Sequence, residues 1–155
     1  MKRERFYSTA IVILSLVILI VVYMKFFHNA PDRPVDIKNI RAIKVYDGSG
    51  TLIGLSDILE EEKNYCLLFD LNDCYSCIAK GISDLKSLKK SGKPCFGLVV
   101  HNLSDEVSGW STQQGFSPFF MLKKTSFYEH IRSPATPVMI TIKDEKVIAF
   151  RYITP

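Results

Sequence analysis

The fold of this chain is decided by residues 65–78, which read Tyr65-Cys66-Leu67-Leu68-Phe69-Asp70-Leu71-Asn72-Asp73-Cys74-Tyr75-Ser76-Cys77-Ile78. The first five residues form an unbroken apolar run, which predicts a strand buried on both faces, as in the centre of a parallel sheet. A segment with helical apolar spacing follows, at Ile78, Ile82, Leu85 and Leu88. Cys74 and Cys77 are therefore expected between a buried strand and the first turn of a helix.

This placement favours thiol chemistry. A helix N-terminus offers unpaired backbone N–H groups and the positive end of the helix dipole, and both stabilise a thiolate. Cys74 falls at the expected helix start and is exposed, whereas Cys77 lies one turn inside and is shielded. The spacing predicts redox exchange, with a structural disulfide, an unused pair or a metal site as the alternatives.

The segments around the cysteine pair predict a strand, helix, strand unit. The first strand covers Asn64 to Leu71, and the helix runs to about Lys90, before Ser91-Gly92 and Pro94. A second apolar run, Cys95 to Val100, follows at a distance that fits a right-handed crossover with parallel pairing.

Hairpins are expected on both sides of this unit. The first joins Ile37–Val45 to Thr51–Leu55 through the turn Asp47-Gly48-Ser49-Gly50, and Ser56-Asp57 then caps a short helical turn. The last joins Val138–Ile142 to Val147–Ile153 through residues 143–146. Between the central unit and the last hairpin we expect a helix capped by Ser104 and ending near Gly115, a short strand Pro118–Leu122 and a short helix Ser126–Ile131.

A membrane segment is expected at the N-terminus. From Ala10 to Met24 the chain is apolar except for Ser15. Counting outward to Phe6 and Phe27 gives 22 residues, or roughly 33 Å of helix, enough to span a bilayer. A cleavable signal peptide is the alternative, but it needs small residues before a cut site. Three basic residues in front of the span, against Lys25 after it, predict a cytoplasmic N-terminus and an extracytoplasmic domain, periplasmic or at the cell surface.

The expected organisation has three parts. Residues 1–28 form a transmembrane anchor with a cytoplasmic basic tail, residues 29–36 a linker and residues 37–155 one α/β domain. The formal net charge of +4 is too small for a nucleic-acid footprint, so no nucleic-acid partner is expected. No Gly-rich phosphate loop, serine nucleophile elbow or glycosidase-type carboxylate pair occurs in the sequence, and no cofactor is expected.

The order strand, Cys-x-x-Cys, helix, strand, helix, followed by Thr136-Pro137 at the start of a hairpin, resembles the thioredoxin fold. Asp47-Gly48 in the leading hairpin and Phe116-Ser117-Pro118-Phe119 make residues 37–154 most similar to the membrane-anchored TlpA/ResA-type redoxins. The resemblance implies a thioredoxin-like three-layer α/β fold. A central mixed sheet would carry an added N-terminal β-hairpin, preceded by one transmembrane helix.

The resemblance also implies roles for individual residues. Cys74 would be the nucleophile and Cys77 the resolving thiol, and the two would form the redox disulfide. Tyr75, Ser76, Thr136 and Pro137 would bind the substrate, with Pro137 in the cis form and the backbone of Thr136 pairing with the substrate chain. No metal is expected at this site.

Two departures from the family pattern shape the expected reactivity. Many relatives have Trp directly before the first cysteine and a buried carboxylate six residues before it, where this chain has Asp73 and Leu68. No cation lies between the cysteines, and Asp73 and Asp70 would repel a thiolate. We expect the pKa of Cys74 to be lowered only modestly, which favours a reducing pair over a strongly oxidising one.

The remaining cysteines and histidines admit two interpretations. Cys66 and Cys95 lie near the starts of neighbouring strands, where they could form a second disulfide or remain buried unpaired thiols, the interpretation we favour. His101 follows the second strand and could meet the cysteine pair as a metal ligand, the less favoured alternative to an unmetallated site.

The sequence therefore predicts an enzyme, a membrane-anchored extracytoplasmic thiol-disulfide oxidoreductase that acts as a disulfide reductase. Its expected partners are cysteine-containing exported proteins as substrates, a membrane electron-relay thiol protein as donor, and the lipid bilayer through the N-terminal helix. The alternative is a non-enzymatic thioredoxin-like binding module or metallochaperone. Apocytochrome maturation, envelope or spore assembly and general disulfide repair are all compatible with these residues.

Overall fold

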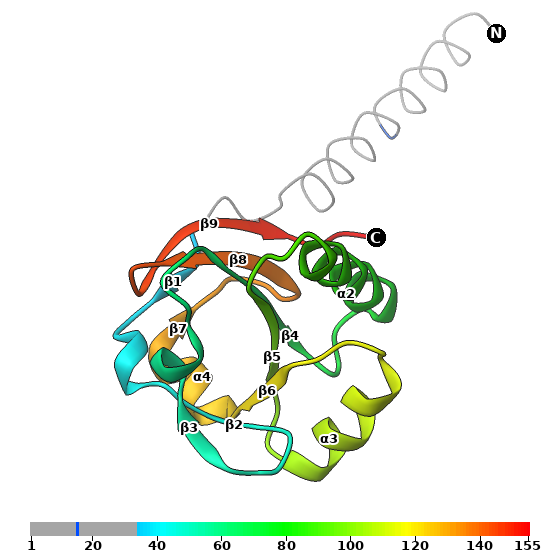
Figure 1. Ribbon diagram of the computed structural model, residues 1–155. Helices are drawn as coiled ribbons and strands as arrows, with labels where there is room; N and C mark the ends of the chain where they lie inside the picture. The colour runs from blue at the N-terminus through cyan, green and yellow to red at the C-terminus, as the bar shows by residue number, and fades with distance from the viewer. Residues whose placement is uncertain (1–14, 16–33) are drawn as a thin grey trace, which may run out of the picture. The chain divides into compact units, whose positions relative to one another are not determined.

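The computed structural model describes residue 15 and residues 34–155. Its main sheet consists of β2 (Lys44–Tyr46), β3 (Leu52–Gly54), β4 (Asn64–Asp70), β5 (Cys95–Val100), β6 (Phe119–Leu122), β8 (Val138–Lys143) and β9 (Lys146–Tyr152). The strand order is β3-β2-β6-β5-β4-β8-β9 (Figure 1). β4, β5 and β6 are parallel, and the other pairings are antiparallel. The expected mixed sheet is confirmed.

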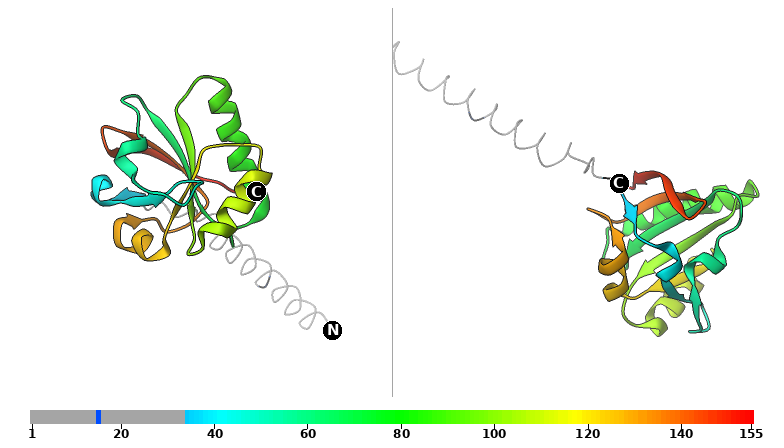
Figure 2. Two further views of the ribbon diagram at one scale, coloured as in Figure 1. Left: turned by 60° about the horizontal axis from the view of Figure 1, so that its bottom comes forward. Right: turned by 90° about the vertical axis from the view of Figure 1, so that its left-hand side faces the viewer.

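Helices cover both faces of this sheet, as the left view of Figure 2 shows. One face carries α2 (Tyr75–Lys90) and α3 (Ser104–Gln113). The other carries α4 (Lys124–His130) and the 3-10 helices η1 (Ile40–Ala42) and η2 (Leu55–Ile58). A two-stranded sheet of β1 (Asp36–Ile37) and β7 (Ile131–Arg132) lies beside them. This arrangement gives the three layers that the family resemblance implies.

β4 is the centre of the structure, because its alternating side chains enter two apolar clusters. Leu67 and Phe69 pack under α2 and α3, whereas Cys66 and Leu68 pack under α4, and all four are fully buried. A strand buried on both faces needs an unbroken apolar run, which is what residues 65–69 provide. Parallel pairing of β4 with β5 also brings their carboxyl ends to one edge of the sheet.

α2 sits close to β4 because its inner face is apolar and locally small. Ile78, Ile82 and Leu85 are buried against the sheet. A Cβ at Gly81 would lie 2.6 Å from the side chain of Leu67, so glycine permits the helix to approach the strand closely. The helix ends at Lys90, as expected, before Gly92 in the left-handed region.

The leading hairpin is present but shorter than expected. Its strands are β2 and β3, whereas the sequence predicts Ile37–Val45 and Thr51–Leu55. Asn39 has a φ of 52°, which interrupts an extended chain and is followed by η1. Ile40 and Ile43 are buried by this turn, and β1 pairs with β7 instead of continuing into the hairpin.

Three further boundaries differ from the expectation. Asp57 lies inside η2, where its carboxylate accepts the N–H of Gly54 at 3.1 Å, so Ser56-Asp57 does not precede the turn. α3 begins at Ser104 with the extended Leu103 in the cap position, so Ser104 is not the cap. α4 begins at Lys124 instead of Ser126. The final hairpin, β8 and β9, is confirmed.

Val35 is buried in the core, and Asp36 belongs to β1. No helix within the described residues is both long and apolar enough to cross a membrane. The expected transmembrane segment, Phe6 to Phe27, lies outside the described residues apart from Ser15.

Candidate functional site

A tight turn at the end of β4 carries the chain to the first cysteine. The Asp70 carboxylate accepts hydrogen bonds from the backbone N–H and the side-chain amide of Asn72, at 3.0 and 2.9 Å. The backbone N–H of Asp73 donates to the carbonyl of Asp70 at 3.0 Å. Asx turns of this kind reverse the chain within a few residues. They place Cys74 in the cap position of α2.

The two cysteines have different surroundings, as the sequence predicts. Cys74 is exposed, whereas Cys77 is 4 % exposed and lies in the apolar cluster under α2. Both are free thiols in the structure, which therefore represents the reduced state of the pair. The exposed Cys74 thiol is accessible to a disulfide in solution. The buried Cys77 thiol is close enough to hydrogen-bond with Cys74.

Hydrogen bonds lower the pKa of Cys74 to about 7, first from the Cys77 thiol, then from the Ser76 hydroxyl, and further from the backbone N–H groups of both residues. The Cys74 sulfur lies 3.0 Å from Ser76 Oγ. Burial raises the pKa of Cys77, and the hydrogen bond and charge of Cys74 raise it further. Cys74 is therefore the more acidic of the two thiols, and its pKa is lowered only modestly, as expected.

We expect the alkylation rate of Cys74 by iodoacetamide to rise about tenfold per pH unit below its pKa and to level off above about pH 7, because only the thiolate reacts. Replacing Ser76 with alanine removes a donor to the thiolate and should move the midpoint upward. Ser91→Ala, beyond the other end of α2, is the control. Identical midpoints for wild type and Ser76→Ala would contradict this role.

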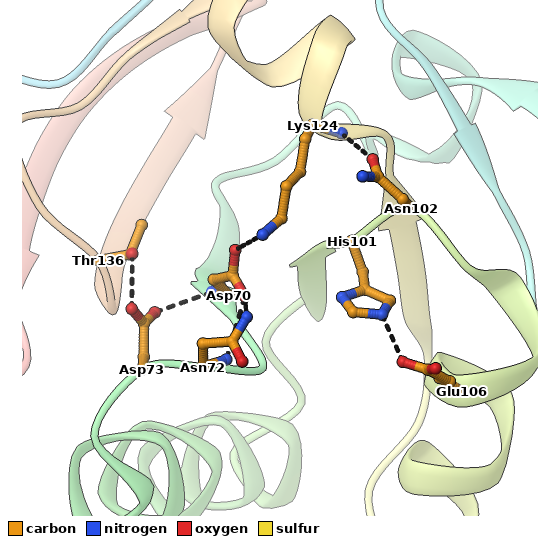
Figure 3. A network of polar contacts seen from close by, with 8 residues as sticks. All are labelled: Asp70, Asn72, Asp73, His101, Asn102, Glu106, Lys124 and Thr136. Atoms are coloured by element: carbon orange, nitrogen blue, oxygen red, sulfur yellow. Dashed lines mark hydrogen bonds and ion pairs between the residues drawn. The ribbon is translucent and has the colours of Figure 1, made fainter.

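Two carboxylates, those of Asp70 and Asp73, precede the cysteine pair in the sequence. Both accept hydrogen bonds from neighbouring groups (Figure 3). Asp70 forms an ion pair with Lys124 at 2.8 Å. Partial burial opposes ionisation of Asp70, but the hydrogen bonds from Lys124 and Asn72 outweigh it and lower the pKa. Asp73 accepts the backbone N–H of Asp70 at 2.8 Å and the Thr136 hydroxyl at 3.0 Å. Lys124 therefore compensates the charge of Asp70, whereas the partners of Asp73 are neutral donors that satisfy its hydrogen bonding without cancelling its charge.

The expected substrate-binding residues differ in accessibility. Tyr75 is 77 % exposed at the first position of α2, and Thr136 is half-buried in the loop before β8. The Thr136-Pro137 bond is cis, as the family resemblance implies. The Pro137 side chain is buried, so Thr136 rather than the proline ring offers surface to a ligand. The Asp73 to Thr136 hydrogen bond links this loop to the cysteine loop.

Cys66 and Cys95 lie on opposite faces of the sheet. Cys66 pairs in register with Phe96, and Cys95 pairs with Tyr65. Because successive side chains of a strand point to opposite faces, the two sulfurs point away from each other. Cys66 belongs to the cluster under α4, and Cys95 packs against the cluster under α2 and α3. Both are free thiols, as the favoured interpretation expects, but only Cys66 is buried and Cys95 is half-buried.

His101 follows β5 at the same edge of the sheet and pairs with Glu106. Its Nε2 lies 2.6 Å from the Glu106 carboxylate. Its Nδ1 is buried and has no hydrogen-bond partner among the residues that the structure describes. Within residues 34–155, no group of three or more His, Cys, Asp or Glu side chains is arranged to hold a metal ion.

Lys124 is the residue that the sequence interpretation missed. It pairs with Asp70 through its side chain, and its backbone N–H donates to the Asn102 side chain at 3.3 Å. The sequence contained a signal for Lys124, because polar residues follow β4, β5 and β6. The carboxyl ends of parallel strands meet at one edge of the sheet, so these residues come together there. The parallel pairing of β6, which sequence periodicity leaves open, was the missing step.

No family model matches the sequence, and no curated protein matches it. Solved structures do match. A thiol:disulfide interchange protein from Bacteroides sp. is 13 % identical over 76 % of this chain and 76 % of its own, with a TM-score of 0.56. The thioredoxin domain of a thiol-disulfide oxidoreductase from Bacteroides vulgatus is 14 % identical over 76 % and 89 %, with a TM-score of 0.52.

The peroxidoxin BcpB from Mycobacterium tuberculosis is 13 % identical over 76 % of this chain and 86 % of its own, with a TM-score of 0.56. At such identities the likeness concerns the fold. What the chain does has to be argued from its own site.

Proposed function

We propose that this chain, which has the thioredoxin-like fold, is a membrane-anchored extracytoplasmic thiol-disulfide oxidoreductase that reduces disulfides with Cys74 and Cys77. The observation that carries the proposal is an exposed, acidified thiol in the cap position of α2 with a buried thiol one turn further on. Structurally similar proteins include thiol-disulfide oxidoreductases, which supports a redox role.

The reaction conserves electrons and protons in two exchange steps. The Cys74 thiolate attacks one sulfur of a substrate disulfide and forms a mixed disulfide, and the other substrate sulfur leaves as a thiolate that takes up a proton. The Cys77 thiol then loses its proton and attacks the Cys74 sulfur. The substrate leaves as a dithiol, and Cys74 and Cys77 are joined by a disulfide. Two electrons have passed to the substrate.

The modest acidity of Cys74 supports the reducing direction. A strongly oxidising pair stabilises its thiolate and has a very low pKa, near 3.5, whereas reducing pairs have values near 7. The pKa of Cys74, about 7, belongs with the second group. Because an exported reductase has to be re-reduced, we propose that a dithiol protein of the membrane acts as its electron donor.

The location rests on the sequence. The apolar stretch Phe6 to Phe27 is long enough to span a bilayer, and basic residues lie in front of it. We propose that it anchors the folded unit outside the cytoplasm, where disulfides form and cysteine-containing exported proteins would be the substrates.

Replacing Cys77 with alanine tests the proposal, because the first step can then proceed and the second cannot. We expect this variant of the full chain to accumulate mixed disulfides with cell-envelope proteins, seen as bands that disappear on reduction and identified by mass spectrometry. The variant Cys74→Ala/Cys77→Ala is the matched control and should trap nothing. Equal trapping by both variants, or by neither, would count against the proposed reaction and favour a binding module.

A further inference from the structure

Asp73 connects the two loops that meet at the cysteine pair. One of its carboxylate oxygens accepts the N–H of Asp70 at the end of β4, at 2.8 Å, and the other accepts the Thr136 hydroxyl at 3.0 Å. Figure 3 shows Asp73 between these two partners. Asp73 and Thr136 are 63 positions apart in the sequence. The carboxylate thus joins the segment before Cys74 to the loop before β8.

The loop from Ser133 to Pro137 has no regular secondary structure, so its position depends on a few contacts. The Ser133 hydroxyl donates to the carbonyl of Ala135 at 2.7 Å, a contact within the loop, and Ser133 also forms a hydrogen bond with the Tyr152 side chain. The carbonyl of Pro137 accepts the N–H of Ile153 at 2.9 Å, which fixes the loop on the side of β9. On the side of the cysteine pair, the Thr136 hydroxyl binds Asp73.

The end of β4, to which Asp73 is hydrogen-bonded, is itself held in place. Asp70 pairs with Lys124 at 2.8 Å, and the Lys124 backbone donates to Asn102 at 3.3 Å. These contacts tie the end of β4 to the segments after β5 and β6. Asp73 therefore connects Thr136 to a segment that these contacts hold in place.

We propose that Asp73 is a positioning residue for protein substrates, holding Thr136 in place so that a polypeptide disulfide lies over the Cys74 sulfur. This inference rests on the proposed function. A polypeptide substrate needs the loop for alignment, because productive attack requires the reacting atoms to be oriented as well as close. A small disulfide reaches the exposed Cys74 without the loop. Asp73 is thus assigned to substrate selection, and its charge is not needed for that role.

Two substitutions at Asp73 separate its hydrogen bonds from its charge. Asparagine removes the charge but retains both contacts, because its amide oxygen can accept the Asp70 N–H and its NH₂ group can donate to Thr136 Oγ1. Alanine removes the charge and both contacts. Any electrostatic effect on Cys74 is common to the two variants, so the difference between them reports the hydrogen bonds.

The test compares two disulfide substrates of the full chain. Insulin is reduced with dithiothreitol as reductant, whereas 5,5′-dithiobis(2-nitrobenzoate) is added to the pre-reduced protein after dithiothreitol has been removed. For insulin we expect Asp73→Ala to lower kcat/KM about tenfold relative to Asp73→Asn, mainly through KM, as for the loss of the neutral hydrogen bonds that asparagine retains. For the small disulfide the two variants should react within about twofold of each other, because only uniform binding of the larger substrate is lost.

Substitutions of Thr136, the hydrogen-bond partner of Asp73, provide a second, independent test. Thr136→Val removes the hydroxyl and should raise KM for insulin as Asp73→Ala does, whereas Thr136→Ser keeps the hydroxyl and should have a lower KM than Thr136→Val. Combining Thr136→Val with Asp73→Ala should add little beyond either change, because both remove the same contact.

Three outcomes would overturn the positioning role. The first is that Asp73→Ala and Thr136→Val reduce insulin as wild type does. The second is that both substrates slow equally, which would mean that Asp73 acts on the thiols. The third is full additivity of the two changes. If wild type reduces neither substrate, the proposed function itself fails, and the positioning role fails with it.

Discussion

Replacing Cys74 with serine is expected to lower the rate of insulin reduction by the full chain at least about 1,000-fold, because a hydroxyl cannot replace the thiolate as nucleophile. The structure makes this residue the reactive one. Cys74 is exposed in the cap position of α2, and its pKa of about 7 leaves a large thiolate fraction at neutral pH. The measurement is insulin turbidity with dithiothreitol as reductant, corrected for the reaction without protein.

Cys95→Ser is the matched control for this change. Cys95 is a free thiol at the start of β5, and burial raises its pKa, so it should not contribute thiolate. Its sulfur lies 3.5 Å from the carbonyl of Leu85, a contact that serine can keep. The control should retain nearly full activity. If Cys74→Ser were as active as Cys95→Ser, Cys74 would not be the nucleophile.

Replacing Gly97 with alanine is expected to destabilise the domain by about 3 kcal/mol, at the upper end of the usual cost of overpacking a core. Gly97 lies in β5 between Leu67 of β4 and Phe119 of β6. An added Cβ would lie 2.1 Å from the Phe119 ring. That ring has little room to move, because its centroid lies 5.3 Å from those of both Trp110 and Phe116.

Gly48→Ala is the control for Gly97→Ala. No atom lies within 4 Å of a Cβ added at Gly48, in the turn between β2 and β3. Its stability should stay within about 0.5 kcal/mol of wild type, as for most surface changes. Urea unfolding of the full chain, followed by circular dichroism, compares the midpoints. Equal midpoints for the two glycine variants would show that Phe119 moves aside at little cost.

Much of the central unit could be predicted, because its signals are local. The apolar run of residues 65–69 identified β4, and the spacing of Ile78, Ile82 and Leu85 identified α2. Their junction predicted an exposed Cys74 and a shielded Cys77, and both predictions are confirmed. The edges of the domain were harder to predict, because local strand preferences are weak there and pairing with segments distant in the sequence decides the structure. For example, β1 pairs with β7 instead of extending the hairpin.

The candidate site was only partly predictable for the same reason. Sequence proximity suggested that Asp70 and Asp73 would repel the Cys74 thiolate. Their partners Lys124 and Thr136 come from distant segments and engage both carboxylates. Leu68, in contrast, was predictable from local sequence, because its full burial follows from its place in the apolar run.

The sequence by itself determined the strand and the helix around the thiol pair, because hydrophobic periodicity and helix-end chemistry act between near neighbours. The tertiary structure alone decided which distant groups surround the thiols. It placed Cys66 and Cys95 on opposite faces, because strand register fixes the direction of every side chain. It also brought Thr136 onto Asp73, a contact set by the packing of β8 against β4 rather than by any local signal.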